Sequence, residues 1–126
     1  MAEVSKESIL DKVSVAFRLA GEEEQFQQQA EHENLILSFQ VERPGLAGTV
    51  TIKDGRISWG SGNAKAPDIS IVWRDWPALE SWARGRMPLW WSRIRRRVKI
   101  QGGWNPTFLE CIYLFRYYLN MFLEKK

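Results

Sequence analysis

Residues 49–60, TVTIKDGRISWG, predict a β-hairpin, and this hairpin decides the fold class. Apolar residues alternate with polar ones on both sides of its centre: Val50 and Ile52 come before it, Ile57 and Trp59 after it. Alternation with a period of two is typical of a strand that has one buried face. Asp54-Gly55 at the centre favours a tight turn, because both residues tolerate a positive φ. The stretch therefore predicts two antiparallel strands that share one apolar face.

Further strands and helices are predicted on either side of this hairpin. Residues 35–41, 68–73 and 98–101 alternate in the same way and predict three more strands. Residues 22–30 are either a short polar helix or an exposed linker. Caps and apolar periodicity predict helices at residues 5–21, 75–85, 86–94 and 105–123. Ser5 caps the first and Gly21 ends it, and Asp75 caps the second and Gly85 ends it. The last helix opens with Asn105-Pro106.

This order of elements predicts an α+β fold, because the strands are joined by hairpins and the helices gather elsewhere. We expect a five-stranded, mostly antiparallel sheet with its helices on one face. The length of 126 residues favours a single domain spanning residues 1–126, with an N-terminal helix within residues 1–21 and a C-terminal helix at 105–123.

Composition excludes several classes of protein. The chain has one cysteine, Cys111, so it forms no internal disulfide and no cysteine metal cluster. Its start, MAEVSKESIL, is too polar for a secretory signal, and no apolar run reaches the roughly 18 residues that a membrane helix needs. The expectation is a soluble, cytoplasmic protein.

Charge is distributed unevenly along the chain. Residues 1–34 carry eight acids and three bases, whereas between Glu80 and Glu110 there are seven bases and no acid. Such a basic block can attract an anionic partner. Alternatively, it is a solvated face that the acidic N-terminal third of the same domain balances.

Signals of catalysis are weak, and we expect no catalytic residue, no metal and no cofactor. The one histidine, His32, lies in a polar stretch with no nucleophile positioned against it. Cys111 lies among apolar residues, as a small buried side chain would. An enzyme on this fold would need an acid or a histidine that points inward, and the predicted strands offer none. Nucleic-acid binding is also disfavoured, because strand parity points Arg97 and Lys99 outward and no known module has this order of elements.

The last helix has two apolar faces where a surface helix needs one. The first face consists of Phe108, Ile112, Phe115, Leu119 and Phe122, and the second of Leu109, Tyr113, Tyr117 and Met121. Another element, a partner chain, a membrane surface or an apolar ligand must bury the second face. Together with the inward-facing Trp59, Trp73, Trp76 and Trp82, the helix suggests an oversized apolar interior, unless these rings simply fill the core.

At this point several motifs, in this order and spacing, resemble the sterol carrier protein type 2 family. They run from Phe26 to Leu109 and include FQQQA (26–30), the strand at 35–39, GTVTIKDG (48–55), PDISI (67–71), the helix from Asp75 to Gly85 and RVKIQG (97–102). The resemblance implies a five-stranded α+β domain that encloses an apolar cavity or tunnel. It also implies binding of fatty acyl chains, sterols or similar lipids without catalysis, with membrane contact during transfer.

The sequence departs from the family's pattern near the last strand. Gly103 stands where members commonly carry an acid, and Trp90, Trp91 and arginines replace a glycine and small residues. These tryptophans either guard a lipid-sized opening or fill it.

We therefore predict non-enzymatic binding or transfer of a fatty acyl, sterol or isoprenoid type lipid, with docking on an anionic membrane as a further expectation. The alternative is a protein-interaction or dimerisation module with a filled cavity, and the oligomeric state stays open. From strand parity and helix faces, the expected lipid-binding residues are Phe39, Trp59, Ile71, Trp73, Leu79, Trp82, Leu89, Trp90, Trp91, Phe108, Ile112, Phe115 and Leu119. The residues expected to contact a headgroup or a membrane are Arg86, Arg93, Arg95 and Arg96.

Overall fold

The computed structural model describes residues 6–62, 64–86, 91, 95–102 and 105–124. The elements follow one another as α1 (Lys6–Ala20), α2 (Glu24–Gln29), β1 (Asn34–Val41), β2 (Leu46–Lys53), β3 (Arg56–Ser61), β4 (Ile69–Trp73), α3 (Trp76–Ala83), β5 (Val98–Gly102) and α5 (Pro106–Glu124). The predicted α+β class is confirmed, and residues 24–29 form a helix rather than a linker.

The five strands form one mixed sheet in the order β3-β2-β1-β4-β5. Every neighbouring pair is antiparallel except β1 and β4, which run parallel, so the sheet is mostly antiparallel as predicted. The hairpin between β2 and β3 turns at Asp54 and Gly55, whose φ angles are 52° and 79°. These positive values are what a two-residue hairpin turn requires.

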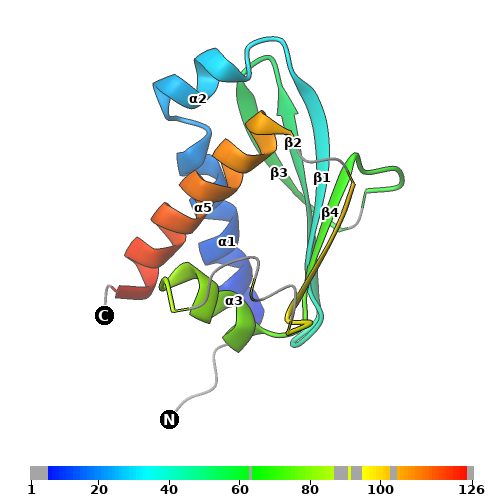
Figure 1. Cartoon of the computed structure of the whole chain (residues 1–126), viewed down its shortest axis with the longest axis vertical. Coiled ribbons are helices and arrows are strands. Elements are labelled where there is room, and N and C mark those ends of the chain that lie inside the picture. Colours follow the sequence, from blue (N-terminus) through cyan, green and yellow to red (C-terminus); the bar gives the residue numbers. More distant parts are fainter. Residues whose placement is uncertain (1–5, 63, 87–90, 92–94, 103–104, 125–126) are drawn as a thin grey trace.

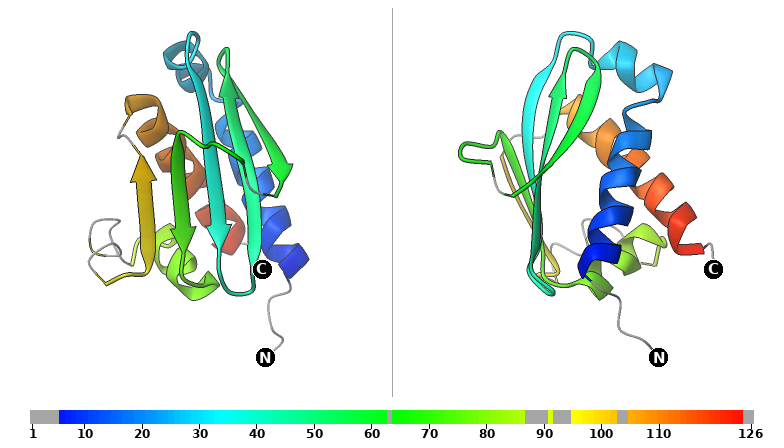
Figure 2. Two further views of the ribbon diagram at one scale, coloured as in Figure 1. Left: turned by 90° about the vertical axis from the view of Figure 1, so that its right-hand side faces the viewer. Right: turned by 180° about the vertical axis from the view of Figure 1, so that it is seen from behind.

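All the labelled helices cover the same face of the sheet, and the other face is left open (Figures 1 and 2). α1 and α5 lie side by side across the covered face, with α3 at one end. Strand residues therefore alternate between a buried apolar side and a polar, open side, as in β2, where every second residue from Leu46 to Ile52 is buried.

Local signals position the two helices that matter most for the site. The Asp75 side chain accepts a hydrogen bond from the Ala78 amide at 2.9 Å and caps α3. Asn105 does the same for α5, accepting from the Thr107 amide at 2.7 Å. Both caps were predicted, because short polar side chains satisfy amides that the first helical turn leaves free. The Ser5 cap and the second short helix at 86–94 fall largely outside the described residues.

No helix in the described part of the chain combines the length and the apolar character that crossing a membrane would take.

Candidate functional site

A small apolar cavity lies between the covered face of the sheet and the helices α3 and α5. Its walls are all apolar or aromatic: Phe39, Ile71, Trp73, Trp82, Ile100, Phe108 and Ile112. The free space inside it is about 10 Å³, which is room for about one water molecule. A pocket for a drug-sized ligand has roughly 300–1,000 Å³, so the interior is closed in this conformation.

Aromatic rings account for most of this filling. Phe17 of α1 stacks on Phe115 of α5 with ring centroids 4.0 Å apart and planes 11° from parallel. The same Phe17 ring meets Phe39 edge-on at 5.4 Å and stacks against Trp59 at 5.8 Å. Gly48 of β2 lies under the Trp59 ring, where any side chain would collide with it. The helices and the sheet therefore meet through a continuous group of rings.

Two tryptophans form the other wall of the cavity. Trp73 at the end of β4 and Trp82 of α3 pack with centroids 5.2 Å apart at an angle of 35°. Trp73 is buried, and its Nε1 has no hydrogen-bond partner in the described part of the chain. A buried hydrogen-bond donor without an acceptor is uncommon in proteins, because leaving it unpaired costs free energy.

The structure brings some of the predicted lipid-binding residues together and separates others. Those that line the cavity are Phe39, Ile71, Trp73, Trp82, Phe108 and Ile112. Leu79, Phe115 and Leu119 are buried in the surrounding core, and Trp59 is half-buried against it. Leu89 and Trp90 lie outside the described residues, so which way Trp90 faces stays a prediction.

Trp91 lies away from the cavity walls. Its side chain is 38% exposed, and the Arg95 guanidinium lies over its ring, 5.6 Å from the centroid. Arg95 and Arg96 border one hollow together with Arg74 and Arg97. Of the other two arginines predicted to contact a headgroup, Arg86 follows α3 and does not border this hollow, and Arg93 lies outside the described residues.

Sequence reasoning missed two contributors to the interior. Phe17 lies within the predicted helix at 5–21, but nothing local indicates that this helix packs against the last one, so Phe17 was not assigned to the site. Ile100 was treated only as a structural strand residue, although strand parity already pointed it inward. At the surface, Arg74 was also missed, because the arginines beside it, Arg95, Arg96 and Arg97, come from the turn before β5, far along the chain.

His32 and Cys111, the two side chains considered for catalysis in the sequence, do not line the apolar cavity. His32 is exposed, and no three of the described His, Cys, Asp and Glu residues are grouped as a metal site would need. Burial raises the pKa of the Cys111 thiol to about 12, which keeps it protonated and unreactive at neutral pH. The fully buried polar residues in this part are Ser38 and Thr107.

Neither a family model nor a curated protein matches the sequence. Solved structures match it over most of its length. The sterol carrier protein domain 2 of Helicoverpa armigera aligns with a TM-score of 0.68 at 12% identity, covering 94% of this chain and 95% of that one. The protein TT1886 of Thermus thermophilus aligns with 0.63 at 14% identity, covering 96% and 90%. The sec-alkylsulfatase Pisa1 of a Pseudomonas species matches 70% of this chain with 0.58 at 18% identity, but this chain spans only 14% of that enzyme's length.

These likenesses and the geometry define the class: an α+β domain whose helices close one face of a mixed five-stranded sheet over an apolar core. Within that class, the fold is that of sterol carrier protein 2. The fold that the sequence motifs implied by resemblance is confirmed.

Proposed function

We propose that this chain is a non-enzymatic lipid-binding or lipid-transfer domain, whose ligand is a fatty acyl, sterol or isoprenoid type molecule. One observation carries the proposal: the sheet, α3 and α5 wall an apolar cavity, and one of its lining residues, Trp73, has an indole N–H without a hydrogen-bond partner in the described part of the chain. The fold supports it, because the domains with a similar fold include sterol carrier proteins. The ligand's chain would contact Phe39, Ile71, Trp82 and their neighbours.

Because the interior is filled, a lipid can enter only if rings move aside. α3 is the element best suited to move, since it is only eight residues long and is followed closely by Gly85, whose φ is 78°. It is held to α5 by Arg116, whose Nε donates to the Trp82 carbonyl at 2.9 Å and whose guanidinium lies over the Trp82 ring. In this proposal a lipid binds the open arrangement and shifts the population toward it.

The indole N–H of Trp73, which has no partner in the described part of the chain, favours ligands that carry a hydrogen-bond acceptor. A pure hydrocarbon would leave Trp73 Nε1 unsatisfied, whereas a carboxylate, ester carbonyl or hydroxyl oxygen would accept its hydrogen bond. The ligand is therefore an apolar molecule with an oxygen at or near the end that reaches Trp73.

Membrane docking is the second part of the proposal. Trp91 is partly exposed beside Arg95, and Arg96 follows within the same turn, so an interfacial aromatic ring lies next to cations. Tryptophan prefers the membrane interface. Each basic residue near an anionic surface adds about 1 kcal/mol. Arg86 and Arg93 would add to this contact. Co-sedimentation with anionic vesicles should succeed at low salt and weaken as salt rises; salt-independent binding or none would contradict docking.

Native mass spectrometry of the purified protein, followed by lipid extraction, tests the ligand part. The expected result is a bound mass that extraction identifies as an acyl, sterol or isoprenoid compound. A displacement assay with a fluorescent fatty acid gives the affinity. The mass of the ligand-free protein from several expression hosts, together with no binding of the fluorescent fatty acid, would contradict the proposal.

One observation favours a second candidate function, a protein-interaction or dimerisation module. The interior is already filled, while α5 carries an aromatic outer face on which Tyr113 is 62% and Tyr117 is 60% exposed. Exposed aromatic groups of this kind mark interaction surfaces. Sedimentation equilibrium over a wide range of protein concentration decides it: association that Tyr117→Ser abolishes would support this function, and a constant monomer mass would exclude a homodimer.

A further inference from the structure

Four arginines line one surface hollow at the end of the sheet. Arg74 follows β4, and Arg95, Arg96 and Arg97 precede β5. The two turns are fixed side by side, because the Arg74 amide donates to the Arg97 carbonyl at 2.8 Å and the next pair along the strands, Trp73 and Val98, lies in register. The hollow is shallow, with a volume of about 380 Å³, and no other described residue lines it.

The backbone is bent in a way that gathers these side chains. In a strand, consecutive side chains point to opposite sides, yet three consecutive arginines border the same hollow. Arg96, the middle one, has a φ of 59°, the left-handed region that glycine adopts easily and that long side chains seldom adopt. Strain of this kind in a native structure is a reason to look for function at that position.

The hollow is short of negative charge. Arg74 Nε lies 3.4 Å from Asp75 Oδ2, but that carboxylate also caps α3 through its other oxygen. Within the described part of the chain, no acid forms an ion pair with Arg95, Arg96 or Arg97. Four guanidinium groups around one space repel one another, and a bound anion relieves that repulsion.

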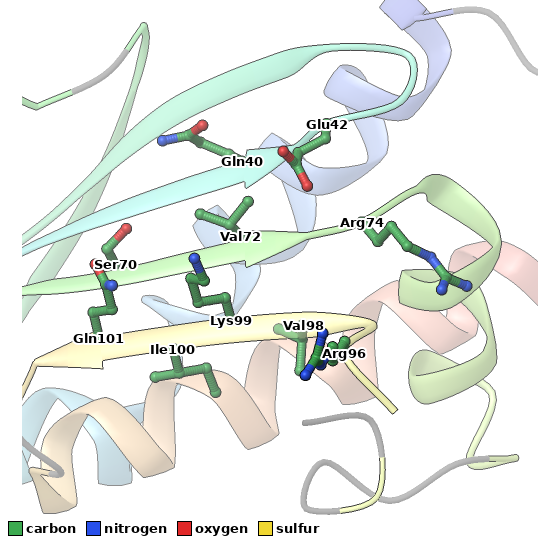
Figure 3. A pocket seen from close by; sticks show the side chains of 10 residues that line it. All are labelled: Gln40, Glu42, Ser70, Val72, Arg74, Arg96, Val98, Lys99, Ile100 and Gln101. Atoms are coloured by element: carbon green, nitrogen blue, oxygen red, sulfur yellow. The ribbon is translucent and has the colours of Figure 1, made fainter. Parts of the chain in front are cut away.

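The neighbouring groove extends the site along the open face of the sheet. Arg74 and Arg96 border both hollows and stand at one end of the groove, as Figure 3 shows. The groove then presents hydrogen-bonding side chains from three strands: Gln40, Ser70, Lys99 and Gln101, with Glu42 as its one described acid. Such groups bind hydroxyls and other uncharged polar atoms.

We infer that the four-arginine hollow binds the phosphate group of a phosphate monoester, and that the groove binds the hydroxyl-bearing remainder of that molecule. Guanidinium forks match phosphate oxygens in pairs, and a dianionic phosphate offers three acceptor oxygens on one atom. This site lies outside the apolar cavity, so it does not depend on the proposed uptake of a lipid into the interior; it deepens the proposed membrane docking, which uses the same Arg95 and Arg96.

Titration with glycerol 3-phosphate, followed by isothermal calorimetry and by ³¹P NMR, tests the site. Glycerol and sulfate at matched ionic strength are the reference ligands. Arg96→Gly removes one guanidinium from a backbone position that suits glycine, so it should fold at least as well as the wild type. Arg56→Gln is the matched control, because Arg56 is also exposed on the open face but lines another hollow.

The expected result is that glycerol 3-phosphate binds more tightly than either reference ligand. Arg96→Gly should weaken it by about tenfold or more, because a charge-assisted, two-pronged contact is lost; Arg56→Gln should leave it within about twofold, since an exposed charge elsewhere contributes little. Equal losses in both variants, unchanged binding in Arg96→Gly, or no preference over sulfate would each overturn the inference.

Vesicles identify the source of the phosphate. Phosphatidic acid carries a phosphate monoester, whereas phosphatidylglycerol carries only a diester, so the two are compared at equal surface charge. A preference for phosphatidic acid that Arg96→Gly removes assigns a lipid headgroup. Binding of soluble glycerol 3-phosphate without any vesicle preference assigns a free phosphate ester. Lipid uptake into the interior is measured separately, so its failure would not be mistaken for failure of this site.

Discussion

Phe17 and Phe115 stack face to face at 4.0 Å, although one lies in the first helix and the other in the last. Both are fully buried, and their contact joins α1 to α5 across the covered face of the sheet. In the proposed function, a lipid in the interior would take space that these rings occupy. The closed interior is therefore a property of this ring contact as much as of the fold.

Replacing Phe17 with alanine should open the interior. The variant should lose about 3–5 kcal/mol of stability, as large-to-small core changes do, and it should bind a fluorescent fatty acid more tightly than the wild type. Chemical denaturation and displacement titrations measure the two effects. Phe26→Ala is the control, because Phe26 is equally buried but belongs to α2. A gain in affinity in both variants, or in neither, would contradict the role given to the ring stack.

The Trp73 indole N–H should discriminate between ligands. Trp73→Phe keeps a ring but removes the donor, so affinity for a fatty acid should fall by about tenfold or more, the usual contribution of a hydrogen bond to a charged group. Affinity for a hydrocarbon probe of the same length should fall less. Trp82→Phe serves as the control for lost ring area. If Trp73→Phe lowers both affinities equally, the N–H does not contact the ligand's oxygen.

Arg116 should limit how fast a ligand enters. Arg116→Met removes the hydrogen bond and the cation–π contact that hold α3 through Trp82, and it should cost about 1–2 kcal/mol of stability. If α3 is the wall that moves, stopped-flow association with a fatty acid should become faster. Arg18→Met, at an exposed position on α1, should leave the rate unchanged. Slower or unchanged association in Arg116→Met would point to another entrance.

Tyr118 should make stability depend on alkaline pH. Its hydroxyl donates a hydrogen bond to the Glu23 carboxylate. This hydrogen bond, and to a lesser degree burial, raises the pKa of Tyr118 from 10.0 to about 12. The folded state therefore holds this proton more tightly than the unfolded state. The contribution is fully present below pH 10 and is lost as pH rises toward 12.

Tyr118→Phe should accordingly lower the free energy of unfolding at neutral pH by about 1 kcal/mol. Above pH 10, the free energy of unfolding of this variant should fall less steeply with pH than that of the wild type. Urea unfolding at a series of pH values measures both. Cys111 titrates in the same sense, since burial raises its pKa from 9.0 to about 12, so the comparison is made in a Cys111→Ala background. An unchanged alkaline slope in the double variant would contradict the Tyr118–Glu23 link.

Much of the fold was predictable because the signals for it are local. Asp54-Gly55 predicted the hairpin, Asp75 and Asn105 predicted helix starts, and each acts through backbone atoms within a few residues of itself. Strand parity likewise predicted that Phe39, Ile71 and Trp73 face inward.

The candidate site was only partly predictable, since its contacts join distant segments. Arg95 and Arg96 were among the four arginines predicted to contact a headgroup, but Arg74 completes their hollow because β4 and β5 are neighbours. Trp91 was expected to guard or fill a lipid-sized opening; its ring is partly exposed beside Arg95, and its contact with a ligand stays a prediction.

The sequence by itself determined the elements, their order and the apolar side of each, because backbone preference and alternation act over a few residues. The tertiary structure alone decided that β4 lies parallel beside β1, that Phe17 meets Phe115, and that four arginines share one hollow. These features depend on strand order and helix packing, which bring together residues that are far apart in the chain. A local sequence pattern does not predict contacts of this kind.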